Sequence, residues 1–226
     1  MIQFFRLAAY DFRQILRDTM LRVFIFTPVF LWLIGFFALP ALIEAYPIIA
    51  PYKVYLLMGL AMQTAVLMGF VGAFMVLDEK DEGVMEALRV LPVSGRYFVG
   101  YRLLLGWLLA YFSAAWLLWS CGDGRIDAAS SLILALPFSL TAPFILLSIA
   151  SVAGNKIEGM ALFKGIDLLL MLPLAAFFLP DGWGWLLSPL PMWGGFRALA
   201  VAYEGGGDWW GFYAMGVGTT LLYIAY

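Results

Sequence analysis

The densest group of ionisable side chains lies in one stretch, Asp78–Pro92, where seven of fifteen residues are charged. From Asp81 the pattern predicts a short helix, because acidic residues favour the positive N-terminal end of a helix and Pro92 cannot continue one. Its apolar residues recur at intervals of four and three, so they share one face that fits a groove in a soluble partner. The residues predicted to contact that partner are Asp81, Glu82, Gly83, Val84, Met85, Leu88, Leu91 and Pro92.

One carboxylate, Asp167, falls inside a long apolar run, with Lys164 three positions earlier on the same helical face. A lone charge at the centre of a bilayer costs roughly 2.5–3.5 kcal/mol on insertion scales, and pairing or a place near the membrane surface lowers that cost. The two residues are therefore either a structural ion pair or part of a pathway or gate for a transported molecule.

Aromatic residues gather in the segment 179–208, between two apolar runs. Trp193 and the nearby Arg197 could line the exit of a pathway, but aromatic rings in such segments also anchor loops at the membrane interface. Anchoring is the favoured interpretation for Trp183 and Trp185, and both interpretations remain open for Trp193.

The residue types that support most enzymatic chemistry are missing. The chain has no histidine and a single cysteine, Cys121, which leaves no Ser-His or Cys-His nucleophile pair, no disulfide and no multi-cysteine metal site. No Gly-Lys dipeptide is present to build a phosphate-binding loop for ATP. The sequence therefore predicts a protein that is not an enzyme and that holds no cofactor or metal of its own.

The composition predicts an all-α protein embedded in a membrane. Hydrophobic residues make up 64% of the 226 positions and charged residues only 12%, with a mean hydropathy of +0.94. A helix needs about 20 apolar residues to cross the hydrocarbon of a bilayer. Six runs meet that need, in a single membrane domain over 1–226: Val23–Ile43, Val54–Leu77, Tyr97–Trp119, Ala129–Val152, Met160–Phe178 and Trp209–Tyr226.

The distribution of basic residues predicts the orientation. Ten of the thirteen Lys and Arg residues fall before the first run, between the second and third, or between the fourth and fifth. Cytoplasmic loops carry the excess of Lys and Arg, so we expect these segments, and both chain termini, on the cytoplasmic side of a bacterial-type inner membrane. Before the first run, apolar positions 5, 8, 12, 15 and 16 predict an amphipathic helix over 1–20 that lies along the membrane surface.

Several of these segments resemble the permeases of the ABC-2 type transporter family. The passage Leu77–Leu88, followed by Leu91–Ser94, is similar to the loop that holds that family's coupling helix, and Phe12–Asp18 to its helix before the first span. Pro189–Trp193, followed by Arg197, is similar to an extracellular element between its last two spans, and Asn155–Gly159 with Lys164 is similar to its drug-export members.

This resemblance implies a permease subunit without its own nucleotide-binding domain. Separate ATPase subunits, which hold ATP and magnesium, would dock on the coupling helix at 81–92, and a second permease copy or a paralogue would complete the pathway. Because the spans offer little charge, we expect the cargo to be an amphipathic drug-like or lipid-like molecule, exported across the lipid bilayer, and no nucleic acid as a partner. Two alternatives remain: a haem-exporter-type permease of cytochrome c maturation, and a membrane scaffold or assembly factor that transports nothing.

Overall fold

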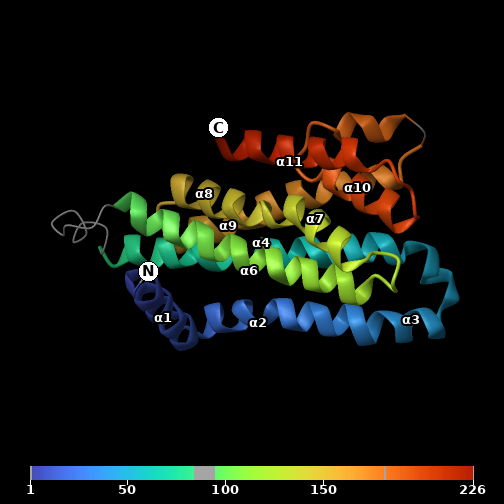
Figure 1. The fold of residues 1–226 in the computed structure, drawn as a ribbon. Helices are drawn as coiled ribbons and strands as arrows, with labels where there is room; N and C mark the ends of the chain where they lie inside the picture. Colours follow the sequence, from blue (N-terminus) through green and yellow to red (C-terminus); the bar gives the residue numbers. More distant parts are fainter. Residues whose placement is uncertain (1, 84–94, 181, 226) are drawn as a thin grey trace.

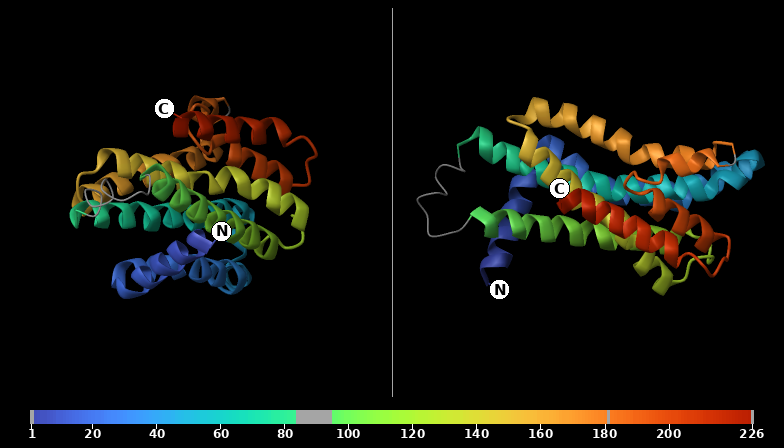
Figure 2. Two further views of the ribbon diagram at one scale, coloured as in Figure 1. Left: turned by 60° about the vertical axis from the view of Figure 1, so that its left-hand side comes forward. Right: turned by 90° about the horizontal axis from the view of Figure 1, so that it is seen from above.

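The computed structural model describes residues 2–83, 95–180 and 182–225, and every regular element within these ranges is a helix. Most of the helices run roughly parallel or antiparallel in one elongated bundle (Figure 1). Helix α1 (Ile2–Arg17) is the exception, because it crosses the long helices instead of running along them (Figure 2). The separate helix predicted over 1–20 is therefore present in the described range.

The first apolar run forms three consecutive helical pieces. Asp18 ends α1 and caps α2 (Thr19–Leu33), its carboxylate accepting hydrogen bonds from the amides of Met20 and Leu21 at 2.8 and 3.0 Å. A π-helical turn, Ile34–Ala38, then leads into α3 (Leu39–Ala45). Together these pieces make one apolar segment, Thr19–Ala45, that is long enough to cross a membrane.

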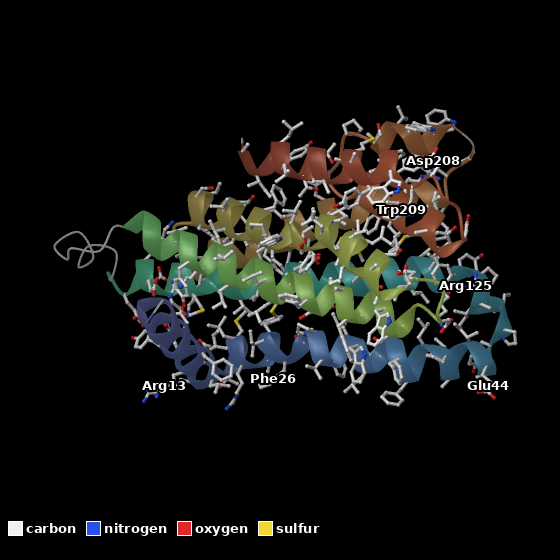
Figure 3. The ribbon with its side chains drawn as sticks, viewed as in Figure 1. Arg13, Phe26, Glu44, Arg125, Asp208 and Trp209 are labelled. Carbon is white, nitrogen blue, oxygen red and sulfur yellow. The ribbon has the colours of Figure 1, made fainter. Side chains whose placement is uncertain are left out.

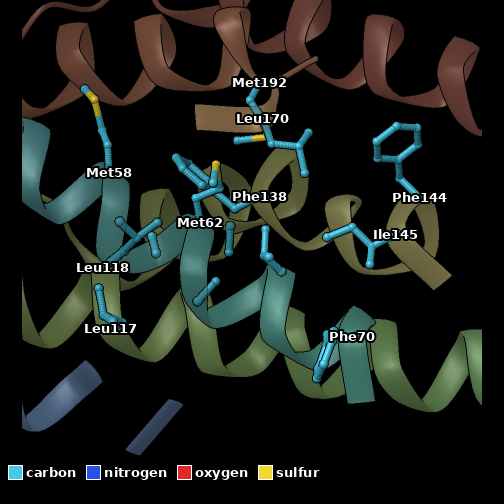
Figure 4. Packing of buried hydrophobic residues seen from close by; sticks show 14 of the residues in the cluster. Met58, Met62, Phe70, Leu117, Leu118, Phe138, Phe144, Ile145, Leu170 and Met192 are labelled. Carbon is cyan, nitrogen blue, oxygen red and sulfur yellow. The ribbon is translucent and has the colours of Figure 1, made fainter. Parts of the chain in front are cut away.

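Helix α4 (Lys53–Asp81) follows a 3-10 turn, Pro47–Tyr52, and occupies the centre of the bundle. In its most apolar window 78% of the residues are buried, whereas only 11% are buried in the corresponding window of the Thr19–Ala45 segment. Side chains of α6, α7 and α8 close around it (Figure 4). A fully apolar helix suits this place because it buries all of its faces against other helices.

The middle of the chain forms two further spans on either side of a short turn. Helix α6 (Gly95–Cys121) is continuous, and α7 (Ala128–Ser139) and α8 (Thr141–Val152) are two halves of one span interrupted at Leu140. Pro137 lies inside α7 and removes a backbone donor near that interruption. Close packing with α4 depends on Gly69, since a Cβ there would lie 2.5 Å from the carbonyl oxygen of Ala142.

The last part of the chain differs most from the prediction. Helix α9 (Lys156–Met171) continues into a 3-10 helix, Leu172–Phe177, as the fifth span. Beyond it, a 3-10 helix, Trp183–Leu187, and α10 (Trp193–Tyr203) occupy the segment 179–208, for which no helix was predicted. Helix α10 packs against α11 (Trp210–Ala225), where a Cβ on Gly194 would lie 2.4 Å from the amide nitrogen of Gly216.

Within the residues that the structure describes, five helical segments are long and apolar enough to cross a membrane, whereas six spans were predicted. The predicted sixth run, 209–226, contains α11, whose 16 residues extend about 24 Å, less than the roughly 30 Å of bilayer hydrocarbon. In Figure 1, α11 ends before the level that α4 and α6 reach. The predicted run and the helix differ little in the described residues, since only Trp209 of the run precedes α11.

The two ends of the bundle carry different side chains. The end of α4 at Asp81, the start of α6 and helix α1 lie at one end, together with Arg13 (Figure 3). The opposite end carries the connections around α3, between α6 and α7, and between α10 and α11, with Glu44, Arg125 and Asp208 (Figure 3).

Candidate functional site

A buried ion network joins three helices that are far apart in the sequence. Arg102 on α6 donates from Nη2 to Asp11 on α1 at 3.0 Å and to Glu79 on α4 at 2.6 Å. A second donation, from Nε, reaches Asp11 at 3.1 Å, and Nη1 contacts Glu79, so both carboxylates are bound in a bidentate manner. The Tyr101 hydroxyl also donates to Asp11. All four residues are less than one-tenth exposed.

The formal charge of this network is negative, because two carboxylates share one guanidinium. A planar guanidinium matches carboxylate geometry, and paired donation makes such bonds stronger than single neutral ones. Removing one member of a buried ion pair leaves an uncompensated charge and typically costs about 3–5 kcal/mol. The network therefore holds α1 against the ends of α4 and α6 in a defined position.

Two lysines extend the network to neighbouring helices. Lys80 on α4 donates to the carbonyl oxygens of Ala150 and Ala153 at the end of α8, at 2.5 and 3.3 Å. Lys156, the first residue of α9, forms an ion pair with Asp78 and lies 3.9 Å from Asp18. We call this set the charged junction: Asp11, Asp78, Glu79, Lys80, Arg102 and Lys156.

The charged junction lies directly beside the segment predicted to bind a partner. Asp81 was predicted to begin that helix, but it is the last residue of α4, because the long central helix continues four residues past the predicted span. Glu82 caps α4, and Gly83 turns the chain with a positive φ of 71°. Asp81, Glu82 and Gly83 are all exposed. The other predicted contact residues, Val84, Met85, Leu88, Leu91 and Pro92, lie outside the described residues.

Asp167 has a different partner from the one predicted. Its Oδ1 accepts a hydrogen bond of 2.9 Å from Nε2 of Gln63 on α4. Lys164 is exposed, and among the ion pairs of the described side chains it forms none with Asp167. The described side chains therefore do not form the ion pair that was one of the two alternatives for Lys164 and Asp167, and a role of these residues in a pathway or gate stays a prediction. Gln63 was missed, although an amide in the middle of an apolar run was a visible signal for such a contact.

Trp193 and Arg197 belong to a compact aromatic group at the opposite end. Trp193 is 1% exposed, and its indole nitrogen donates to the carbonyl of Gly184 at 2.9 Å. The guanidinium of Arg197 lies 4.7 Å from the Phe177 ring centre and 5.6 Å from that of Trp193. Trp185 lies tilted against Trp193, with their ring centroids 4.8 Å apart. We call these residues, Phe177, Trp185, Trp193 and Arg197, the aromatic cluster. Trp183 and Trp185 themselves are more than half exposed.

The side chains of the charged junction and the aromatic cluster bind other helices of the same chain. Among the residues that the structure describes, no group of three or more Cys, Asp or Glu residues is placed to hold a metal ion. Cys121 is buried, and burial opposes formation of a reactive thiolate. The charged junction links α1, α4, α6, α8 and α9 through ion pairs and hydrogen bonds.

Comparison with known proteins gives a consistent result over nearly the whole chain. Residues 11–226 match the family model described as Fluoroquinolones export permease protein Rv2686c-like. The chain is 31% identical over 209 residues to the fluoroquinolones export permease proteins Rv2686c and MT2760 of two Mycobacterium tuberculosis strains, H37Rv and CDC 1551. The aligned region covers 88% of this chain and 82% of each relative. No solved structure matches the chain.

Proposed function

Since this chain belongs to the Rv2686c-like family of fluoroquinolones export permeases, we propose that it is the membrane-spanning subunit of an ATP-driven ABC-2 type exporter. Its cargo is an amphipathic aromatic drug of the fluoroquinolone class. This drug class is the one in the names of the two relatives, of which 82% of the length is aligned with this chain. The observation that carries this proposal is the family match, which spans residues 11–226 and so includes all five membrane-spanning segments.

The proposed topology has six spans and places both termini and the charged junction in or at the cytoplasm. Helix α11 would be the sixth span, with the bilayer thinned locally around this short helix and α10 packed against it on the outer side. Ten of thirteen basic residues support this orientation, because they belong to the N-terminal segment and to two loops at the same end of the bundle.

The proposed energy source is a separate ATPase subunit that binds the segment 81–92. Glu82 and Gly83 follow the last residue of α4. Glu79 lies one helical turn earlier and accepts a hydrogen bond from Arg102. A push on the segment would therefore reach α1, α4 and α6 through the charged junction. ATP and magnesium would be held by the partner, and a second copy of the chain, or a paralogue, would complete the pathway.

Two other functions were open from the sequence. A haem-exporter permease and a transport-free scaffold both fit six apolar helices and an acidic loop, but the family match favours the drug exporter over both. The exposed charge at the end of α4 also favours an ATPase partner, because a surface that only rested on an anionic membrane would not gather acidic residues.

Co-purification with the ATPase tests the proposal. The full chain should isolate a stoichiometric ATPase, and inverted vesicles containing both should accumulate a fluoroquinolone when ATP is added. Glu82→Arg should abolish both results, whereas the matched change Glu204→Arg, at an exposed site on the opposite end, should abolish neither. A complex that survives Glu82→Arg would contradict the proposed docking site. Vesicles that accumulate no drug with an intact complex would contradict the proposed cargo.

A further inference from the structure

A cavity of about 570 Å³ lies between α1, α2, α4 and α6, and Asp11 and Arg102 of the charged junction line one end of it. We call it the α2–α6 groove, bounded by Phe12, Pro28, Val29, Val71, Gly106 and Leu109. Its volume falls in the range of sites that enclose drug-sized molecules, about 300–1,000 Å³. The walls are mainly apolar, as expected for a site that accepts a molecule from the lipid phase.

The inner end of the α2–α6 groove is charged. Asp11 and Arg102 both line the cavity, and Glu79 shares the Arg102 guanidinium. Among the described side chains, the two carboxylates and one guanidinium give this end a formal charge of −1. The charge favours a cation and disfavours an anionic lipid phosphate, because a group taken out of water needs an opposite charge as a partner.

The rest of the groove suits a flat ring system. From Arg102 to Leu109 the wall formed by α6 extends about 10 Å along the helix axis, comparable to a fused two-ring aromatic with a cyclic amine. Gly106 has no side chain to occupy the groove. The space beside it is open, since a Cβ there would meet only the carbonyl oxygen of Met68, at 3.9 Å. Beyond Pro28 and Val29 a second cavity of about 420 Å³ continues between Trp32 and Trp116.

We propose that the α2–α6 groove binds the cargo as an aromatic molecule with a protonated amine, the amine beside Asp11 and the rings between α2 and Gly106. This inference rests on the proposed export function and adds the site and chemical class of the bound molecule. The Tyr101 hydroxyl and the Arg102 guanidinium position the Asp11 carboxylate for the amine. The aromatic cavity beside Trp32 then gives the rings a continuous apolar path toward the opposite end of the bundle.

Equilibrium binding of a matched pair of drugs tests the site without ATP. The full chain in nanodiscs is titrated with ciprofloxacin, whose amine is protonated, and with N-acetylciprofloxacin, whose amine is blocked, and their fluorescence is followed. Ciprofloxacin, which carries the protonated amine, should bind at least about tenfold more tightly than its acetylated form, as expected for one buried charge pair. Asp11→Asn should remove this preference. Equal affinity of the wild-type chain for the two drugs would overturn the proposal.

A glycine pair supplies the steric test. Gly106→Leu fills the groove and should weaken ciprofloxacin binding at least about tenfold, because a packed site does not accept the extra volume. Gly100→Leu adds the same side chain to the same helix at an exposed position with no neighbouring atom within 4 Å, and binding should stay within about twofold.

Unchanged drug binding by Gly106→Leu would overturn the site. Native mass spectra would then show whether the groove holds lipid instead: the wild-type chain would carry a phospholipid that the variant has lost, while drug binding is unaltered. The outcome is separable from that of the proposed function. Binding as expected without ATP-driven export would contradict the exporter and keep the site. Export by Gly106→Leu at the wild-type rate would contradict the site and keep the exporter.

Discussion

At one end of the bundle the helices are joined through buried charge, whereas at the other they are joined through aromatic rings and close backbone contacts. In the charged junction, Arg102 ties α6 to α1 and α4, and Lys156 ties α9 to α4. In the aromatic cluster, Arg197 lies against rings and Trp193 bonds a carbonyl. Ion pairs depend on exact partners, and aromatic packing depends on volume.

The largest expected effect comes from Arg102→Met. The change leaves Asp11 and Glu79 buried without their shared cation, so the free energy of unfolding should fall by about 3–5 kcal/mol. Steric trapping of the purified protein in bicelles measures the loss. The triple variant with Asp11→Asn and Glu79→Gln should recover part of it, because no unpaired charge then remains. If the single change leaves stability unaltered, the charged junction does not hold the helices.

A smaller effect is expected at the aromatic cluster from Trp193→Phe. The ring contacts with Trp185 and Phe212 are largely kept, but the buried Gly184 carbonyl loses its donor, so the cost should be about 1–2 kcal/mol. The same unfolding measurement applies. Trp185→Phe, at an exposed ring with no hydrogen bond to lose, is the matched control and should change stability by less than about 0.5 kcal/mol. Equal losses in the two variants would show that the hydrogen bond contributes nothing.

A weaker effect still is expected from Lys53→Met, which removes the ion pair with Asp123 at the same end of the molecule as the aromatic cluster. The Asp123 side chain is half exposed, so water replaces the lost partner and the cost should stay below about 1 kcal/mol. Raising the salt concentration should reduce the difference from the wild-type chain further. A loss as large as that of Arg102→Met would remove the contrast between the two ends.

The smallest effect is a pH dependence at Asp127, the cap of α7. Hydrogen bonding to Ser130 holds the pKa of the Asp127 carboxyl below its ordinary value. The ionised Asp127 carboxylate therefore stabilises the folded state. This stabilisation is fully present above the pKa of the unfolded chain and is lost as the pH falls through the lower pKa of the folded chain. Asp127→Asn keeps a capping side chain without a titrating group, so its melting temperature should vary less with acid than that of the wild-type chain. Parallel acid melting curves for both proteins would contradict the assignment.

Much of the fold was predictable, because the length of an apolar run is a local property. Five predicted spans correspond to helical segments, and a separate helix precedes the first of them. Helix α10 was missed because its glycines and aromatics fit a loop equally well until Gly194 and Gly195 meet Gly216 on α11. Helix α11 begins at Trp210, one residue after the predicted start of the last run.

The candidate site was predictable only in part. The concentration of charge at Asp78–Glu82 marked the region, but Asp11 and Arg102 were counted only as members of basic or amphipathic segments. Nothing in their local sequence indicates that residues 91 positions apart form a bidentate pair. Asp167 illustrates the same limit, since Lys164 was its nearest charge in sequence while Gln63 is its hydrogen-bond donor in space.

The sequence by itself determined that the chain is helical, apolar and membrane-embedded, since composition and the length of each run decide whether water or lipid surrounds a helix. Only the tertiary structure decided which charges are buried together and where a cavity remains. Both depend on how helices distant in the chain approach one another, and that approach is set by side-chain volume and small residues such as Gly69 and Gly194.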